Sequence, residues 1–146
     1  MTIEEVKRQI THWVEKWYPV VGDMRLDVNI DWASSPDIRS GCEVNESYLY
    51  CELQFSPTRV IAVHTNTDNG QLDLEAMEQE VIHECAHTIG WRMAQRLIEA
   101  EVSEKESRRL EEQVTSMIDR AIWKAYQLGR EECQTSAPGP RKKSSS

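Results

Sequence analysis

Residues 81–90 read VIHECAHTIG, and within them His83, Glu84 and His87 form an HExxH motif. Residues four apart on an α-helix lie on one face, so both imidazoles would project from the same side, one turn apart. Two nitrogens in that arrangement can bind a single Zn²⁺ ion. Glu84 is rotated by about 100° from His83, and from there it can reach a water molecule on the ion. The motif therefore predicts a zinc site on a helix, with Glu84 as its general base.

A catalytic zinc ion takes three protein ligands, so a third must come from outside the motif. A histidine three residues after Gly90 would supply it, but position 93 is Met. The other common ligand is a glutamate on a following helix, and residues 108–114 (RRLEEQV) offer Glu111 and Glu112. On a helical wheel, Glu111 lies about 60° from the centre of the apolar face and Glu112 about 160° from it. Because a ligand must point inward, we expect Glu111 to bind the metal, with Glu112 as the alternative.

The N-terminus predicts an amphipathic helix. Thr2 and Glu5 form a capping box, and Pro19 and Gly22 mark the end of the helix. Apolar residues recur at helical spacing and should face the core: Ile3, Val6, Ile10, Trp13, Val14 and Trp17.

Several segments between this helix and the motif have the alternating or β-branched pattern of strands. They cover residues 26–32, 47–55 and 59–64. Turn-forming residues predict loops at 34–36 and 40–41. We therefore expect a short antiparallel sheet of about three strands and an α+β fold.

The composition from residue 72 to residue 128 is helical. A single helix of that length would extend for about 85 Å, so the segment must fold back on itself. Ser103 and Glu106 form a second capping box, which predicts that the second helix starts there. An antiparallel pair then requires either that the first helix breaks near residue 95 or that Gly90 ends it earlier as a C-cap. The sequence leaves both possibilities open.

The chain has 146 residues and a net charge of −8. Its length predicts one domain, residues 1–132, and the low-complexity ending predicts a disordered tail, residues 133–146. An acidic protein repels the phosphate backbone, so we expect no nucleic-acid partner.

No apolar run approaches the roughly 20 residues of a membrane span, so we expect no membrane partner. The start, MTIEEVKRQI, lacks the basic and apolar regions of a signal peptide. The four cysteines have no CxxC spacing, and we expect free thiols in a cytoplasmic protein.

With an HExxH motif and a glutamate on a later helix, the sequence resembles the gluzincins. It is more similar to the small zincin-like metallopeptidases encoded by phages and prophages. Their core is an N-terminal helix, a short antiparallel sheet, the HExxH helix and a helix that begins with an E-E-x-V-like stretch. The matching residues are His83, Glu84, His87 and residues 111–114 (EEQV). The resemblance implies a zincin-like fold, one Zn²⁺ ion per chain and a peptide or protein substrate.

The resemblance also implies that an edge strand beside the metal holds an extended peptide, and residues 59–63 are the candidate. Larger gluzincins use a Tyr or His to stabilise the oxyanion, and no matching motif is present here. His64, at the end of that predicted strand, could approach the site, whereas Tyr126 is too far along the last helix.

Our hypothesis from the sequence is a zinc metallopeptidase in which Glu84 activates the water that attacks the peptide bond. The alternative is a regulatory or interaction protein that keeps the fold and the metal but has little general protease activity. A structural zinc domain would need a fourth ligand, from Cys85 or Glu112. The oligomeric state and the substrate sequence stay open.

Overall fold

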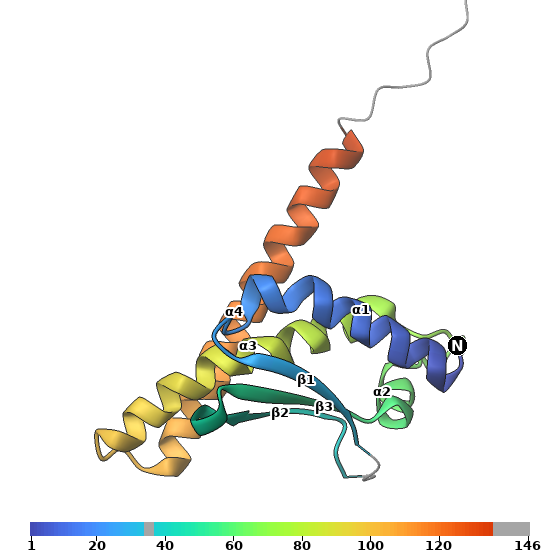
Figure 1. Cartoon of the computed structure of the whole chain (residues 1–146). Coiled ribbons are helices and arrows are strands. Elements are labelled where there is room, and N and C mark those ends of the chain that lie inside the picture. The colour runs from blue at the N-terminus through green and yellow to red at the C-terminus, as the bar shows by residue number, and fades with distance from the viewer. Residues whose placement is uncertain (34–36, 136–146) are drawn as a thin grey trace, which may run out of the picture.

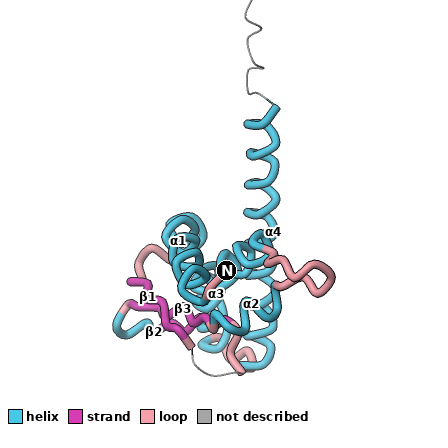
Figure 2. Tube along the Cα trace, turned by 90° about the vertical axis from the view of Figure 1, so that its right-hand side faces the viewer, coloured by secondary structure: helices cyan, strands magenta, loops and turns pink. Residues whose placement is uncertain are grey.

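The computed structural model describes residues 1–33 and 37–135, and in these residues it shows an α+β fold with four helices and one three-stranded sheet. The elements are α1 (Ile3–Val21), β1 (Asp27–Trp32), β2 (Ser40–Asn45), the 3₁₀ turn η1 (Glu46–Tyr48), β3 (Tyr50–Phe55), α2 (Pro57–His64), α3 (Leu74–Glu99) and α4 (Glu104–Thr135). Helix α3 lies between the sheet and α4, and the last turns of α4 project beyond the body of the protein (Figures 1 and 2).

The sheet is mixed, with strand order β1-β3-β2. β1 pairs with β3 in parallel, whereas β2 pairs with β3 antiparallel. The expected small sheet is confirmed, but the expected purely antiparallel pairing is wrong. Because the central strand is the last of the three in sequence, β2 occupies an edge and leaves one side of its backbone unpaired by any other strand of this sheet.

Two of the predicted segments have a different structure. Residues 59–64 belong to helix α2, because Pro57 occupies its first turn, where the fixed φ of proline favours helix. Ser40 and Gly41, predicted as a loop, begin strand β2 instead. Pairing of that segment with β3 outweighs its turn-forming composition, since strand propensity depends strongly on tertiary context. The predicted loop at 34–36 lies outside the described residues.

Helix α1 begins as predicted. Glu5 N–H donates to the Thr2 hydroxyl, and Thr2 N–H donates to the Glu5 carboxylate. The helix continues through Pro19 as far as Val21, so Pro19 lies within its last turn and Gly22 alone caps it. The predicted apolar face is buried apart from Ile3, which precedes the region covered by the rest of the fold.

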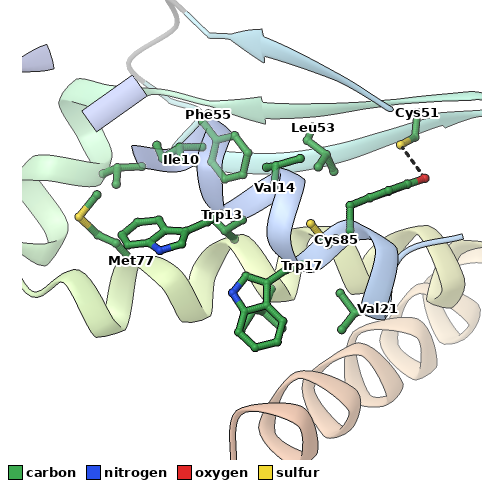
Figure 3. Close-up of a cluster of buried hydrophobic side chains, with 14 of the residues drawn as sticks. Ile10, Trp13, Val14, Trp17, Val21, Cys51, Leu53, Phe55, Met77 and Cys85 are labelled. Atoms are coloured by element: carbon green, nitrogen blue, oxygen red, sulfur yellow. Dashed lines mark hydrogen bonds between the residues drawn. The ribbon is translucent and has the colours of Figure 1, made fainter. Parts of the chain in front are cut away.

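The hydrophobic core forms where α1, β3 and α3 meet (Figure 3). The inward face of β3 contributes Cys51, Leu53 and Phe55, and none of these side chains is exposed. Met77 and Cys85 reach the same core from α3, on the side of that helix opposite α4. Burial of this face fixes how α3 is rotated about its axis, and therefore which of its residues face α4.

Helix α3 is continuous from Leu74 to Glu99, so neither a break near residue 95 nor a cap at Gly90 occurs. Gly90 instead allows close approach of α4: a Cβ atom there would lie 2.6 Å from Thr115 Oγ1. The second helix starts at Glu104, and Glu106 N–H donates to the Ser103 hydroxyl at 3.3 Å, as the predicted capping box requires.

Helix α4 extends to Thr135, beyond the predicted domain boundary at residue 132, and residues 136–146 lie outside the described part of the chain. No helix in the described ranges combines the length and the apolar composition needed to cross a bilayer. Cys42, Cys51 and Cys85 are free thiols, which confirms the prediction for these three.

Candidate metal centre

His83 and His87 lie one turn apart on the side of α3 that faces α4. Their rings meet edge to face, with centroids 4.6 Å apart and the Nε2 atoms 3.1 Å apart. Both side chains are about four-fifths covered, at 22% and 18% exposure. The spacing of the motif therefore brings two imidazole nitrogens to one point, as predicted.

Each imidazole is held from behind by a carboxylate on α4. His83 Nδ1 lies 2.6 Å from Asp119 Oδ2, and His87 Nδ1 lies 3.3 Å from Glu111 Oε1. A carboxylate accepts hydrogen bonds, so both contacts favour imidazoles that carry the proton on Nδ1. In that tautomer, both Nε2 atoms carry free lone pairs, and they lie 3.1 Å from each other. Carboxylates in this position orient histidine ligands in many metal sites.

The carboxylate that faces the two Nε2 atoms belongs to Glu112. Its Oε1 lies 3.3 Å from His83 Nε2, and its Oε2 lies 3.5 Å from His87 Nε2. One donor atom from each of the three residues falls within 4.8 Å of the other two. Of the two candidates for the third ligand, Glu112 thus faces the two Nε2 atoms, whereas Glu111 lies behind His87.

The helical wheel predicted the burial of the two glutamates correctly. Glu111 is 8% exposed, whereas the Glu112 side chain is 58% exposed. The expectation that the inward glutamate binds the metal depended on a buried site. The Nε2 atoms instead point toward the open side of the seam between α3 and α4, where the outward-facing glutamate is within reach.

The donor separations fit a zinc ion. Zn–N distances of about 2.0–2.1 Å in a tetrahedral site place neighbouring donor atoms roughly 3.3 Å apart. The two Nε2 atoms lie 3.1 Å apart, His83 Nε2 lies 3.3 Å from Glu112 Oε1, and His87 Nε2 lies 3.5 Å from the other oxygen of that carboxylate, Oε2. Two imidazoles and one carboxylate also form a ligand set that zinc accepts in catalytic sites. The residues present therefore fit the metal that the motif implies.

Glu84 lies next to this cluster and is buried, at 6% exposure. Burial raises the pKa of its carboxyl above the ordinary value, while a hydrogen bond with Ser40 and the charges of the two histidines act in the opposite direction. The hydrogen bond with Ser40, at the start of β2, holds the Glu84 carboxyl on one side.

Several charges act on His87. Burial disfavours its charged form, but the hydrogen bond with Glu111 and the nearby carboxylates of Glu84 and Glu112 outweigh that cost and raise the pKa of the imidazole. The cluster therefore attracts positive charge, whether a proton or a cation occupies it.

The cluster opens into a cleft of about 550 Å³ between β2, α3 and α4. Its walls carry two arginines that the sequence analysis did not single out. Arg39 Nε lies 2.9 Å from Glu80 Oε1, and Arg108 Nε lies 3.2 Å from Glu104 Oε1. These ion pairs hold each side chain through one nitrogen. No sequence pattern identifies either arginine, because the cleft forms between segments far apart in the chain.

Asp119 was also missed. It lies seven residues after Glu112 and therefore on the same flank of α4, which on the helical wheel faces away from the apolar centre. The sequence does contain a signal for Asp119, because a carboxylate two turns after a candidate ligand lies near the same site.

The other candidates lie outside the cluster. His64 Nε2 contacts Glu80 Oε2, and the other oxygen of that carboxylate, Oε1, pairs with Arg39. Tyr126 packs against Trp17, with ring centroids 5.1 Å apart, and accepts a hydrogen bond from Lys16. Cys85 is fully buried in the core. His64, Tyr126 and Cys85 do not line the cleft.

Comparison of the chain with protein-family models, with curated proteins and with solved structures finds no match.

Proposed function

We propose that the protein is a zinc-dependent metallopeptidase whose metal is held by His83, His87 and Glu112. The observation that supports it most is the convergence of both Nε2 atoms and the Glu112 carboxylate on one point, at donor spacings that suit zinc, with Glu84 beside them. Zinc, when bound, supplies Lewis acidity and a water molecule that is nucleophilic at neutral pH.

The remaining chemistry belongs to side chains of this chain. Glu84 accepts the proton of the attacking water and later delivers it to the amine that leaves the cleaved peptide. Burial raises the pKa of this carboxyl, which brings it closer to the value that both steps require. Asp119 and Glu111 keep the two imidazoles in the ligating tautomer.

Negative charge develops on the carbonyl oxygen of the substrate during the attack and must be stabilised. Arg39 and Arg108 line the cleft, and each has guanidinium nitrogens beyond the one that pairs with a glutamate. They take the place of the Tyr or His of larger gluzincins in this proposal.

An extended peptide substrate also needs a strand of the protein with which it can pair. Residues 59–63 cannot pair with a peptide, because they are helical. Strand β2 is an edge strand, and its residues Ser40, Gly41 and Cys42 line the cleft. An extended peptide paired with β2 would pass the metal centre. The order of helix, sheet, HExxH helix and ligand helix likewise supports a zincin-like core.

A second function has one observation in its favour. Among the described residues that line the cleft there is no tyrosine, and the two histidines are the proposed ligands. This composition favours a metal-binding interaction protein with little general protease activity. A closed structural zinc site is less favoured, because the cluster has three convergent ligand groups and opens into a cleft.

Two measurements on the untagged full chain test the proposal. Mass spectrometry under native conditions should show one zinc ion per chain, lost in both His87→Ala and Glu112→Ala. A peptide library should be cleaved by the zinc-loaded protein and not by Glu84→Gln. Failure to bind zinc would overturn both functions. Zinc binding without any cleavage would favour the interaction protein.

A further inference from the structure

A second hollow adjoins the metal centre along the seam between α3 and α4. It has a volume of about 420 Å³ and is lined by Gln79, Asp119, Arg120, Trp123, Lys124 and Gln127. Asp119 belongs to both places, since its carboxylate lies 2.6 Å from His83 Nδ1. A ligand in this hollow would therefore contact a residue that holds a proposed metal ligand.

The hollow and the cleft at the metal centre both border α4. A third depression, about 520 Å³ in volume, shares Glu112 with the metal cleft and Arg120 with the hollow. Four residues that follow Glu112 at helical spacing lie on the same side of α4 as it does: Ser116, Asp119, Arg120 and Trp123. We call the path from Glu112 past Arg120 to Trp123 and Lys124 the α4 groove.

The charges of the α4 groove are unusual for this acidic chain. Along the same helix, Arg108, Arg109 and Arg130 each pair with a glutamate. Arg120 and Lys124, in contrast, form no ion pair with any residue whose side chain the structure describes. They lie four residues apart, a spacing at which like charges repel each other on a helix. The two carboxylates of the groove, Glu112 and Asp119, face the histidines, so the positive charge lies at the end of the groove that Arg120 and Lys124 form, and it attracts an anionic group there.

The wall between these cations is aromatic. Trp123 lines the hollow and also packs against the core, where its ring centroid lies 5.5 Å from that of Tyr126. Gln79 and Gln127 close the hollow with neutral amides. The groove therefore offers an apolar surface beside positive charge, which suits a polypeptide segment with acidic and large apolar side chains.

We propose that the α4 groove binds an acidic segment of the polypeptide substrate, which also carries a large apolar side chain. This inference rests on the proposed peptidase function for its link to cleavage. Arg120 and Lys124 lie about 12 and 18 Å along the helix from Glu112. An extended peptide advances about 3.3 Å per residue, so the acidic residues fall about four to six positions from the cleaved bond.

The test uses full-length, zinc-loaded protein and a peptide library that is randomised at six positions on each side of a constant centre. The wild type should select Asp or Glu, next to Phe, Leu or Trp, four to six positions to one side of the cleaved bond. Arg120→Glu/Lys124→Glu should reverse the selection toward Lys and Arg. Arg8→Glu/Arg59→Glu changes the net charge equally on exposed residues outside the groove, and it should leave the selection unchanged. Cleavage without preference at these positions would overturn the inference.

A binding measurement separates this inference from the proposed function. Fluorescein-labelled dodecapeptides with either a Glu-Phe-Glu or a Lys-Phe-Lys centre are titrated onto the Glu84→Gln protein, and anisotropy is recorded. The acidic peptide should bind more tightly, and Arg120→Glu/Lys124→Glu should weaken it by at least about tenfold. If the acidic peptide binds more tightly but the wild type cleaves no peptide, the inference about the groove is supported and the proposed peptidase function is overturned. Equal binding of both peptides would overturn the groove, whether or not the protein cleaves peptides.

Discussion

Asp119 Oδ2 lies 2.6 Å from His83 Nδ1, and this contact joins the HExxH helix to a residue 36 positions later in the chain. It shows that α4 does more than cover α3. One flank of α4 supplies the carboxylate that faces the Nε2 atoms, Glu112, and the carboxylate that orients His83 from behind. The proposed metal centre therefore depends on how α3 and α4 pack against each other.

Asp119→Ala should weaken zinc binding about 10- to 100-fold, the range for loss of a carboxylate that orients a histidine ligand. The reason is that His83 would no longer be held in one tautomer and orientation. Competition with a chromophoric chelator measures the affinity. Arg120→Ala, at the next position on the same helix, is the matched control and should bind zinc normally. Equal affinities of the two variants would contradict the role of Asp119.

Glu112→Gln and Glu111→Gln should differ in their effect on the metal. The first removes the charge that faces both Nε2 atoms and should abolish stoichiometric zinc binding at micromolar zinc. The second changes a group that contacts His87 Nδ1 and should only weaken binding, by about 10- to 100-fold. Isothermal titration with zinc distinguishes the two. The opposite order of effects would move the third ligand to Glu111.

Glu84→Gln should leave zinc binding intact and reduce hydrolysis by about 10²- to 10⁴-fold, because an amide cannot accept the proton from the attacking water. The substitution is close in shape, so the buried side chain keeps its place beside Ser40. Single-turnover cleavage of a peptide that the wild type hydrolyses provides the measurement. Full activity of this variant would exclude Glu84 as the general base.

Gly90→Ala should destabilise the protein by about 1–3 kcal/mol, although alanine favours helices more than glycine does. The new Cβ would lie 2.6 Å from Thr115 Oγ1 and 3.1 Å from Glu111 Cγ, so α4 would have to move away. The same movement would displace Glu111 and Glu112 and lower zinc affinity. Thermal denaturation of the apo and zinc-loaded forms measures both effects.

Thr115→Ala provides the complementary test. The Thr115 hydroxyl is buried, and within the described part of the chain it has no hydrogen-bond partner. Its removal should change stability by less than about 1 kcal/mol, because no hydrogen bond is lost and an unpaired polar group is no longer buried. In the double variant with Gly90→Ala, part of the lost stability should return. Strict additivity of the two changes would show that the contact between them is not the cause.

Much of the local structure could be predicted from the sequence. The predicted capping boxes at Thr2 and Ser103 depend on residues three apart; the box at Thr2 is complete, and at Ser103 the hydroxyl accepts the hydrogen bond from Glu106 N–H. The buried face of β3 follows from strict alternation over a few residues. The prediction of a strand at 59–64 was wrong. The β-branched composition of this segment suits a strand, whereas Pro57, which lies outside it, favours a helix.

The strand at 40–45 could not be predicted for a different reason. Ser40 and Gly41 have turn-forming side chains, and only the antiparallel partner β3 makes the segment a strand. The wrong prediction of a loop at 40–41 hid part of the candidate site, because β2 forms one wall of the cleft and Ser40 forms a hydrogen bond with Glu84.

The sequence by itself determined that His83 and His87 share one helix face and that Glu111 is buried while Glu112 is exposed, since helical periodicity alone decides both. Only the tertiary structure decided which carboxylate meets the Nε2 atoms. Gly90 lets α4 approach α3 closely, and the core packing of α3 rotates the imidazoles toward the open side of the seam. A helical wheel measures burial within one helix, whereas a metal site depends on where two helices direct their side chains relative to each other.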